Sequence, residues 1–125
     1  MNTKRQIEYW INTAQDDLET AELLINSNKI LHGLFFCHLS VEKAIKAHIV
    51  RCTANVPPKI HNLAFLLEKT DLKFNEHQLL LCDKLMFYQL EGRYPEFYPK
   101  VPSKQESEQL LQQSKELLLC LKRKL

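Results

Sequence analysis

The sequence predicts an all-α protein, an up-and-down bundle of four long helices and one short helix. The 125 residues include only two glycines and five prolines. Leu, Lys, Glu and Gln, which all favour helices, dominate the rest. No stretch alternates β-branched and polar residues as a half-buried strand does. At this length we expect one domain over residues 1–125, with a sizeable core.

The first helix is expected over about residues 3–27, because apolar residues recur there at steps of three and four. These residues are Tyr9, Trp10, Ala14, Leu18, Ala21 and Leu24/Ile25. The Asn26-Ser27-Asn28 break has residue types that suit a helix end and a new cap. Since this connection is short, the first two helices should pack antiparallel.

The second helix is expected over about residues 30–53, with one apolar stripe along it. The stripe contains Leu31, Leu34, Phe35, Val41, Ile45, Ile49 and Cys52. Lys43, Ala47 and Arg51 are expected to point away from it. Gly33 lowers helix stability relative to Ala, which suggests close packing or a ligand near that turn.

Three further helices are expected, each bounded by prolines or capping residues. Two prolines, at positions 57 and 58, end the second helix, and a short third helix should follow to about Glu68. Asn75 with Gln78 resembles a capping box and should open a fourth helix that runs to about Glu91; Ser103 with Glu106 should open a fifth. The residues expected to face inward are Leu63, Leu66, Leu67, Leu79, Cys82, Leu85, Met86, Leu90, Leu110, Leu111, Leu117, Leu118 and Leu121.

Charge and cysteine content favour an ordinary cytoplasmic protein. The net charge is +2, and the surplus lies in the last segment, which contains Lys122-Arg123-Lys124. Cations there are typical of a helix C-terminus, and a nucleic-acid surface normally needs a broader basic face. Four cysteines form no C-x-x-C pair, and Cys37, Cys52 and Cys82 are expected in the core. No apolar run has transmembrane length, so no membrane association is expected.

His38 and Glu42 lie four residues apart inside the apolar stripe of the second helix. Ionisable groups there are costly unless they are paired or hydrogen-bonded. One interpretation is a buried polar pair in which Glu42 accepts from His38 or from an adjacent helix, and the other is a functional site. With His61 the two could form three metal ligands, but this is no recognised signature, so neither a metal nor a cofactor is expected. The remaining histidines, at 32, 48 and 77, are expected at the surface or its boundary.

Residues 92–102 form the most unusual loop, with three prolines, three aromatic residues and one arginine. We expect it either to pack on the bundle or to line a binding surface. Arg93 could grip an anion, and Tyr94 and Tyr98 could stack on a base. His61 and Lys46 complete the ligand-binding candidates. Alternatively, Arg93 pairs with Glu96 or Glu91 and the tyrosines pack on the bundle.

The sequence resembles a known family. His38-Leu39-Ser40-Val41-Glu42-Lys43-Ala44-Ile45-Lys46-Ala47, then Pro57-Pro58-x-x-His61-Asn62-Leu63, then Arg93-Tyr94-Pro95-Glu96 are similar to the HEPN domain (higher eukaryotes and prokaryotes nucleotide-binding), of the nucleotidyltransferase-associated type. The resemblance implies a helical bundle that commonly dimerises and often pairs with a minimal nucleotidyltransferase in toxin–antitoxin systems.

Many HEPN domains are metal-independent ribonucleases in which an Arg precedes a His by four to six intervening residues. Here Tyr98, Pro99 and Lys100 occupy those positions after Arg93, and His61 follows Arg51 only after nine intervening residues. No catalytic residue is therefore assigned. We expect a module that binds a nucleotide or RNA, or partners a nucleotidyltransferase, as a homodimer. The alternatives are a ribonuclease toxin with a diverged site and a structural dimerisation module.

Overall fold

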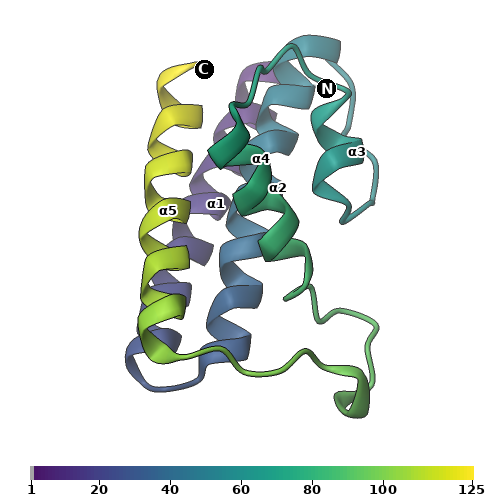
Figure 1. Cartoon of the computed structure of the whole chain (residues 1–125). Coiled ribbons are helices and arrows are strands. Elements are labelled where there is room, and N and C mark those ends of the chain that lie inside the picture. Colours follow the sequence, from purple (N-terminus) through teal and green to yellow (C-terminus); the bar gives the residue numbers. More distant parts are fainter. Residues whose placement is uncertain (1) are drawn as a thin grey trace.

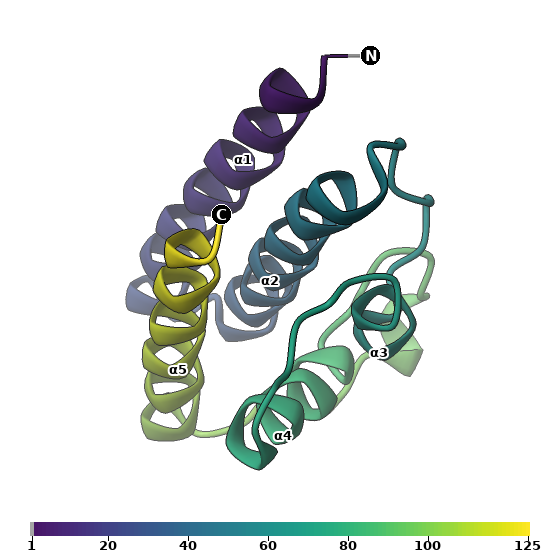
Figure 2. The same cartoon turned by 90° about the horizontal axis from the view of Figure 1, so that it is seen from above.

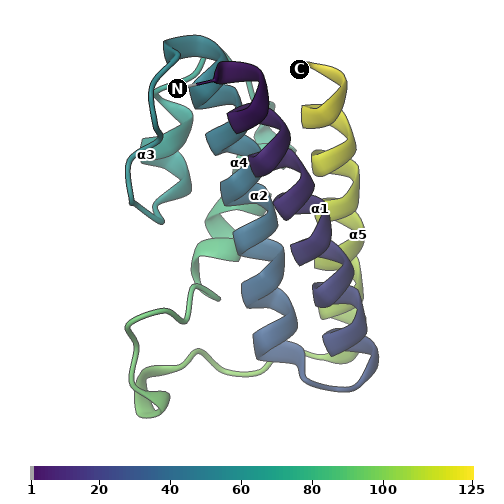
Figure 3. The same cartoon turned by 180° about the vertical axis from the view of Figure 1, so that it is seen from behind.

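The computed structural model describes residues 2–125 and contains five α-helices. They are α1 (Thr3–Asn26), α2 (Ile30–Thr53), α3 (Leu63–Leu67), α4 (Glu76–Met86) and α5 (Lys104–Arg123), with a 3-10 turn, η1, at Pro95–Phe97. The long helices lie side by side and alternate in direction, with α1 and α4 running opposite to α2 and α5 (Figures 1 and 3). The predicted all-α, up-and-down bundle is confirmed, and no strand occurs within residues 2–125.

Helix α2 is the centre of the bundle and packs against α1, α3, α4 and α5 (Figure 2). It is therefore buried on nearly every side, not along a single stripe. Ala47 and His48 are fully buried, although the sequence placed the first on an outward face and the second near the surface. Cys52, expected in the core, is exposed because it lies in the last turn, beyond the neighbouring helices.

The close approach of α1 and α2 depends on Gly33. A Cβ built on Gly33 would lie 2.5 Å from Cγ1 of Ile25 and 3.1 Å from the carbonyl oxygen of Ala21. Both distances are too short for an additional carbon atom, and Ile25 is itself fully buried. Of the two explanations that the sequence offered for this glycine, the structure shows close packing.

Side chains cap the starts of three helices, and the caps of α4 and α5 are the ones that the sequence predicted. Asn62 accepts from the backbone N–H of Phe65 and so begins α3. Asn75 and Gln78 form a complete capping box at the start of α4. The side chain of Ser103 accepts from the backbone N–H of Glu106. Each cap satisfies a backbone donor that the helix itself leaves without a partner.

Helix α4 differs from the prediction in its length and in the face that it buries. It ends at Met86 instead of near Glu91, and the chain turns away through Gly92, whose φ of +81° suits glycine. Leu79, expected inside, is 44% exposed, whereas Leu81 is buried. Three consecutive leucines at 79–81 leave the apolar face ambiguous in sequence, and packing against α2 and α5 selects the face.

The remaining core follows the predicted pattern closely. Ala14, Leu18, Ala21 and Ile25 of α1 are buried, but Tyr9 is exposed. Every predicted inward leucine of α5 is buried. Within residues 2–125, no helix is both long enough and apolar enough to cross a bilayer.

Candidate functional site

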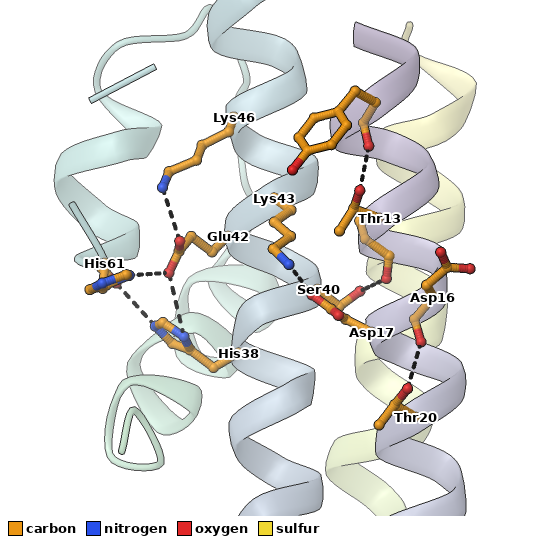
Figure 4. Close-up of polar contacts among 12 residues, drawn as sticks. Thr13, Asp16, Asp17, Thr20, His38, Ser40, Glu42, Lys43, Lys46 and His61 are labelled. Carbon is orange, nitrogen blue, oxygen red and sulfur yellow. Dashed lines mark hydrogen bonds and ion pairs between the residues drawn. The ribbon is translucent and has the colours of Figure 1, made fainter. Parts of the chain in front are cut away.

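The polar residues of α2 lie inside the bundle, where they meet a loop that precedes α3. His38 is fully buried, and Glu42 and Lys46 are almost so. Their spacing of four residues places them on one side of α2, the side that faces His61 (Figure 4). Such burial requires that each charged or polar group find a partner in the protein.

Both carboxylate oxygens of Glu42 have donors. Lys46 donates through Nζ to Oε2 at 3.0 Å, and His61 donates through Nδ1 to Oε1, also at 3.0 Å. The ammonium of Lys46 also lies 5.4 Å from the centroid of the Trp10 ring. A buried carboxylate with a cation on one oxygen and an imidazole on the other is fully compensated.

His38 contacts this pair less directly than its spacing predicted. Its Nδ1 is 3.8 Å from Oε1 of Glu42, which is too long for a hydrogen bond. Instead, Nε2 donates to the carbonyl oxygen of His61 at 3.0 Å, and Nδ1 has no hydrogen-bond partner. Burial lowers the pKa of His38 below its ordinary value, although the charge of Glu42 opposes this effect. His38 therefore anchors the backbone of the His61 loop as a neutral ring.

His61 joins the buried pair to the surface. Its ring is 39% exposed, and Nε2 lies 3.1 Å from Oε2 of Glu91, a residue of the segment that follows α4. Both ring nitrogens thus face carboxylate oxygens. Close polar contacts run from Lys46 through Glu42 and His61 to Glu91, and they connect three segments of the chain.

The candidates of the 92–98 segment lie outside this interior network. Arg93 is partly buried and lines a shallow cleft of about 340 Å³ with Asp83, Met86 and Phe87. Tyr94 is 70% exposed. The ring of Tyr98 packs edge-on against His32, with centroids 6.4 Å apart, near the start of α2.

The predicted candidates therefore separate by environment. His61 and Lys46 come together through Glu42, but Lys46 is enclosed in its ion pair. Arg93 follows Glu91 by two residues, so the segment that carries it reaches the His61 loop. Tyr98 makes a packing contact, whereas Tyr94 is exposed and Arg93 is partly exposed at the cleft beside α4.

Metal ligands and reactive thiols are two other kinds of site to consider within residues 2–125. No three His, Cys, Asp or Glu side chains there are placed to hold a metal ion. Burial raises the pKa of both Cys37 and Cys82 to about 12, so these thiols stay protonated and unreactive at neutral pH.

A second polar cluster, which the sequence analysis did not assign, lies at the end of α2. His48 is fully buried, and Arg51 contacts both His48 and Asp71. From Ala44 to Val50 the helix is apolar on every side except at Lys46 and His48. That pattern could have indicated a central helix, and hence a buried histidine.

The comparisons with known proteins agree with the geometry of the bundle. The family model for the HEPN domain matches residues 7–124. The crystal structure of TT1696 from Thermus thermophilus covers 100% of both chains with a TM-score of 0.80 and 23% sequence identity. At that identity the likeness concerns the fold alone. No curated protein sequence matches the chain. Because the family model spans nearly all of it, this chain belongs to the HEPN domain family.

Proposed function

We propose that this HEPN domain binds a nucleotide or single-stranded RNA through residues 92–98, without the family's usual ribonuclease chemistry. The supporting observation is that the guanidinium of Arg93 forms no ion pair within residues 2–125. The nearby carboxylate of Glu91 lies against His61 instead. A guanidinium without a carboxylate partner is available to grip a phosphate through paired donors.

The aromatic side chains beside Arg93 support the same function. Tyr94 and Phe97 are both about two-thirds exposed, so neither is held by the core. Exposed aromatic rings beside a cation are typical of surfaces on which bases stack while phosphates are neutralised. The contact between His61 and Glu91 holds the preceding residues against the bundle and so restrains the position of this segment.

A protein partner is a second candidate function, because α4 exposes apolar side chains. Leu79 and Leu80 are about half exposed, and Phe87, just after the helix, is exposed further. Leu80 and Phe87 are seven residues apart and lie on the same side. Such a surface suits contact with a minimal nucleotidyltransferase or with a second copy of the chain.

The test is a titration of fluorescent single-stranded RNA and of ATP against purified protein. Arg93→Ala and Tyr94→Ala should each weaken binding, with Arg93→Ala also reducing the dependence on salt. Arg5→Ala and Tyr9→Ala are matched controls, since both replace exposed residues on α1. Equal affinities for all five proteins, or no binding by any, would remove the 92–98 segment from consideration.

A further inference from the structure

The end of the bundle where α2 and α5 terminate carries a concentration of positive charge. Arg51 of α2, Lys73 of the segment between α3 and α4, and Lys124 just after α5 line an open depression of about 290 Å³. Asp71 and Leu72 complete its lining. These three segments are far apart in sequence, but Figure 1 shows them meeting at one end of the molecule.

Arg51 is held in place from the interior by His48. The Nδ1 atom of His48 accepts from Nε of Arg51 at 3.0 Å and from Nη2 at 2.9 Å. On the opposite side of the ring, Nε2 donates to the carbonyl oxygen of Leu121 at 2.8 Å. Burial lowers the pKa of His48, which keeps the ring neutral and its Nδ1 lone pair available. The guanidinium is therefore oriented before any ligand arrives.

The outward edge of Arg51 already holds an anion. Asp71 accepts from Nη2 at 2.5 Å and from Nη1 at 3.3 Å, so the carboxylate occupies the paired donors. Arg51 lowers the pKa of Asp71 to about 2, so the carboxylate is always charged near neutral pH. The side chain of Asp71 is 69% exposed. Ion pairs this exposed contribute little to stability and are easily exchanged.

The charges around the depression favour a ligand with more negative charge than Asp71. Three cations face one carboxylate there, which leaves a surplus of two positive charges. The dipoles of the α2 and α5 C-termini explain why cations gather at this end. They do not explain a guanidinium positioned by a buried histidine, with its paired donors directed outward.

We propose that Arg51, Lys73 and Lys124 bind a phosphate monoester dianion, whose phosphoryl oxygens displace the carboxylate of Asp71 from Arg51. Asp71 is then an internal competitor that holds the guanidinium while the site is empty. The terminal phosphate of a nucleotide and that of an RNA chain have the same chemistry here. The site uses no residue of the 92–98 segment, so its test is independent of the function proposed above.

The experiment measures binding of 5′-AMP and of a 5′-phosphorylated hexa-adenylate by calorimetry, with adenosine and the 5′-hydroxyl hexamer as probes that lack the terminal phosphate. For wild type, each 5′-phosphorylated probe should bind more tightly than its counterpart without the phosphate, which can bind only through the 92–98 segment. A larger gain for the hexamer than for AMP would identify an RNA end as the source. Arg51→Lys keeps the charge but loses the paired donors, so binding should weaken roughly tenfold or more. Asp71→Asn removes the competitor and should tighten binding.

Controls separate this site from general attraction to a basic surface. Lys84→Ala removes one exposed charge from α4 and should leave binding unchanged, whereas Lys73→Ala should weaken it. Arg93→Ala should weaken the binding of phosphorylated and unphosphorylated probes alike and so leave the gain due to the 5′-phosphate unchanged, which distinguishes this site from the 92–98 segment. Thermal melts of each variant establish that the fold is intact. The proposal is overturned if Asp71→Asn binds no tighter than wild type, if Lys84→Ala and Lys73→Ala weaken binding equally, or if no phosphorylated probe binds.

Discussion

His61 donates through Nδ1 to Oε1 of Glu42 at 3.0 Å, and this contact ties a loop residue to a carboxylate inside the bundle. The second oxygen of Glu42 accepts from Lys46, four residues further along α2. Glu42 is thus the common partner of a surface-linked imidazole and a buried ammonium. We therefore expect the three groups to contribute to stability as one unit.

Replacing Glu42 with Gln should strongly destabilise the protein, because it strands the buried ammonium of Lys46. Removing one partner of a buried ion pair costs about 3–5 kcal/mol. Adding Lys46→Met to Glu42→Gln should recover part of the lost stability, since no charge then remains buried without a partner. Urea unfolding measures each free energy, with Glu8→Gln as an exposed control. A loss for Glu42→Gln no larger than that for Glu8→Gln would show that the pair is not stabilising.

The free energy of unfolding should fall as the pH drops below about 6.5. Burial lowers the pKa of His38 and of His48 from 6.5 in the folded protein. Below pH 6.5 the unfolded chain therefore binds protons that the folded protein does not, so acid favours unfolding. Each such histidine contributes up to about 1.4 kcal/mol per pH unit.

Urea unfolding at pH 7.5, 6.5 and 5.5 measures this dependence. Around His38 the charged neighbours are Glu42, His61 and Lys46, and around His48 they are Arg51, Asp71 and Lys124. His38→Leu should reduce the slope of the unfolding free energy against pH. His77→Gln should not change this slope, because His77 is exposed. A stability that is constant or rises on acidification contradicts the prediction.

Replacing Gly33 with Ala should destabilise the bundle in spite of alanine's better helix propensity. The new Cβ would overlap Cγ1 of Ile25, so the Ile25 side chain or the two helices would have to shift. Overpacking of this kind costs about 1–3 kcal/mol, against a propensity gain of about 1 kcal/mol. Thermal melts compare Gly33→Ala with Asn12→Ala, an exposed position on α1. A higher melting temperature for Gly33→Ala than for wild type would mean that the helices are not in close contact there.

We predict a homodimer at micromolar concentration. Leu80 and Phe87 expose large apolar side chains on the same side of α4, and aromatic side chains are enriched at interface cores. Light scattering after gel filtration should give twice the chain mass for wild type and a lower mass for Phe87→Ser. Leu23→Ser, an exposed leucine of α1, is the control. A monomer mass for wild type would rule the dimer out.

Purified protein should not cleave RNA in the absence of metal. Arg93 has no histidine at the spacing of the ribonuclease motif, and the first residue at that spacing, Tyr98, packs on His32. A phenol is also a poor general base at neutral pH. Cleavage assays compare wild type with Arg93→Ala. Activity in wild type that the variant loses would favour the ribonuclease with a diverged site instead.

Local sequence patterns were sufficient to predict the helices, their caps and most of the core. Asn62, Asn75 and Ser103 cap helices because their side chains satisfy backbone donors a few residues away, an effect that depends only on neighbours in sequence. The leucine stripe of α5 was predicted correctly for the same reason, because spacing alone sets which residues share a side.

The contacts between helices and loops depend on tertiary packing and could not be predicted in this way. His48 and Ala47 are buried because four helices surround α2. The apolar run from Ala44 to Val50 indicates a central helix, but it does not specify which helices surround it. The burial of Leu81 in place of Leu79 depends on how α4 rotates against its neighbours. The pairs of His61 with Glu42 and of Arg51 with Asp71 join residues about twenty positions apart. Such contacts form only when loop lengths and helix packing bring the partners together, which spacing along one helix cannot specify.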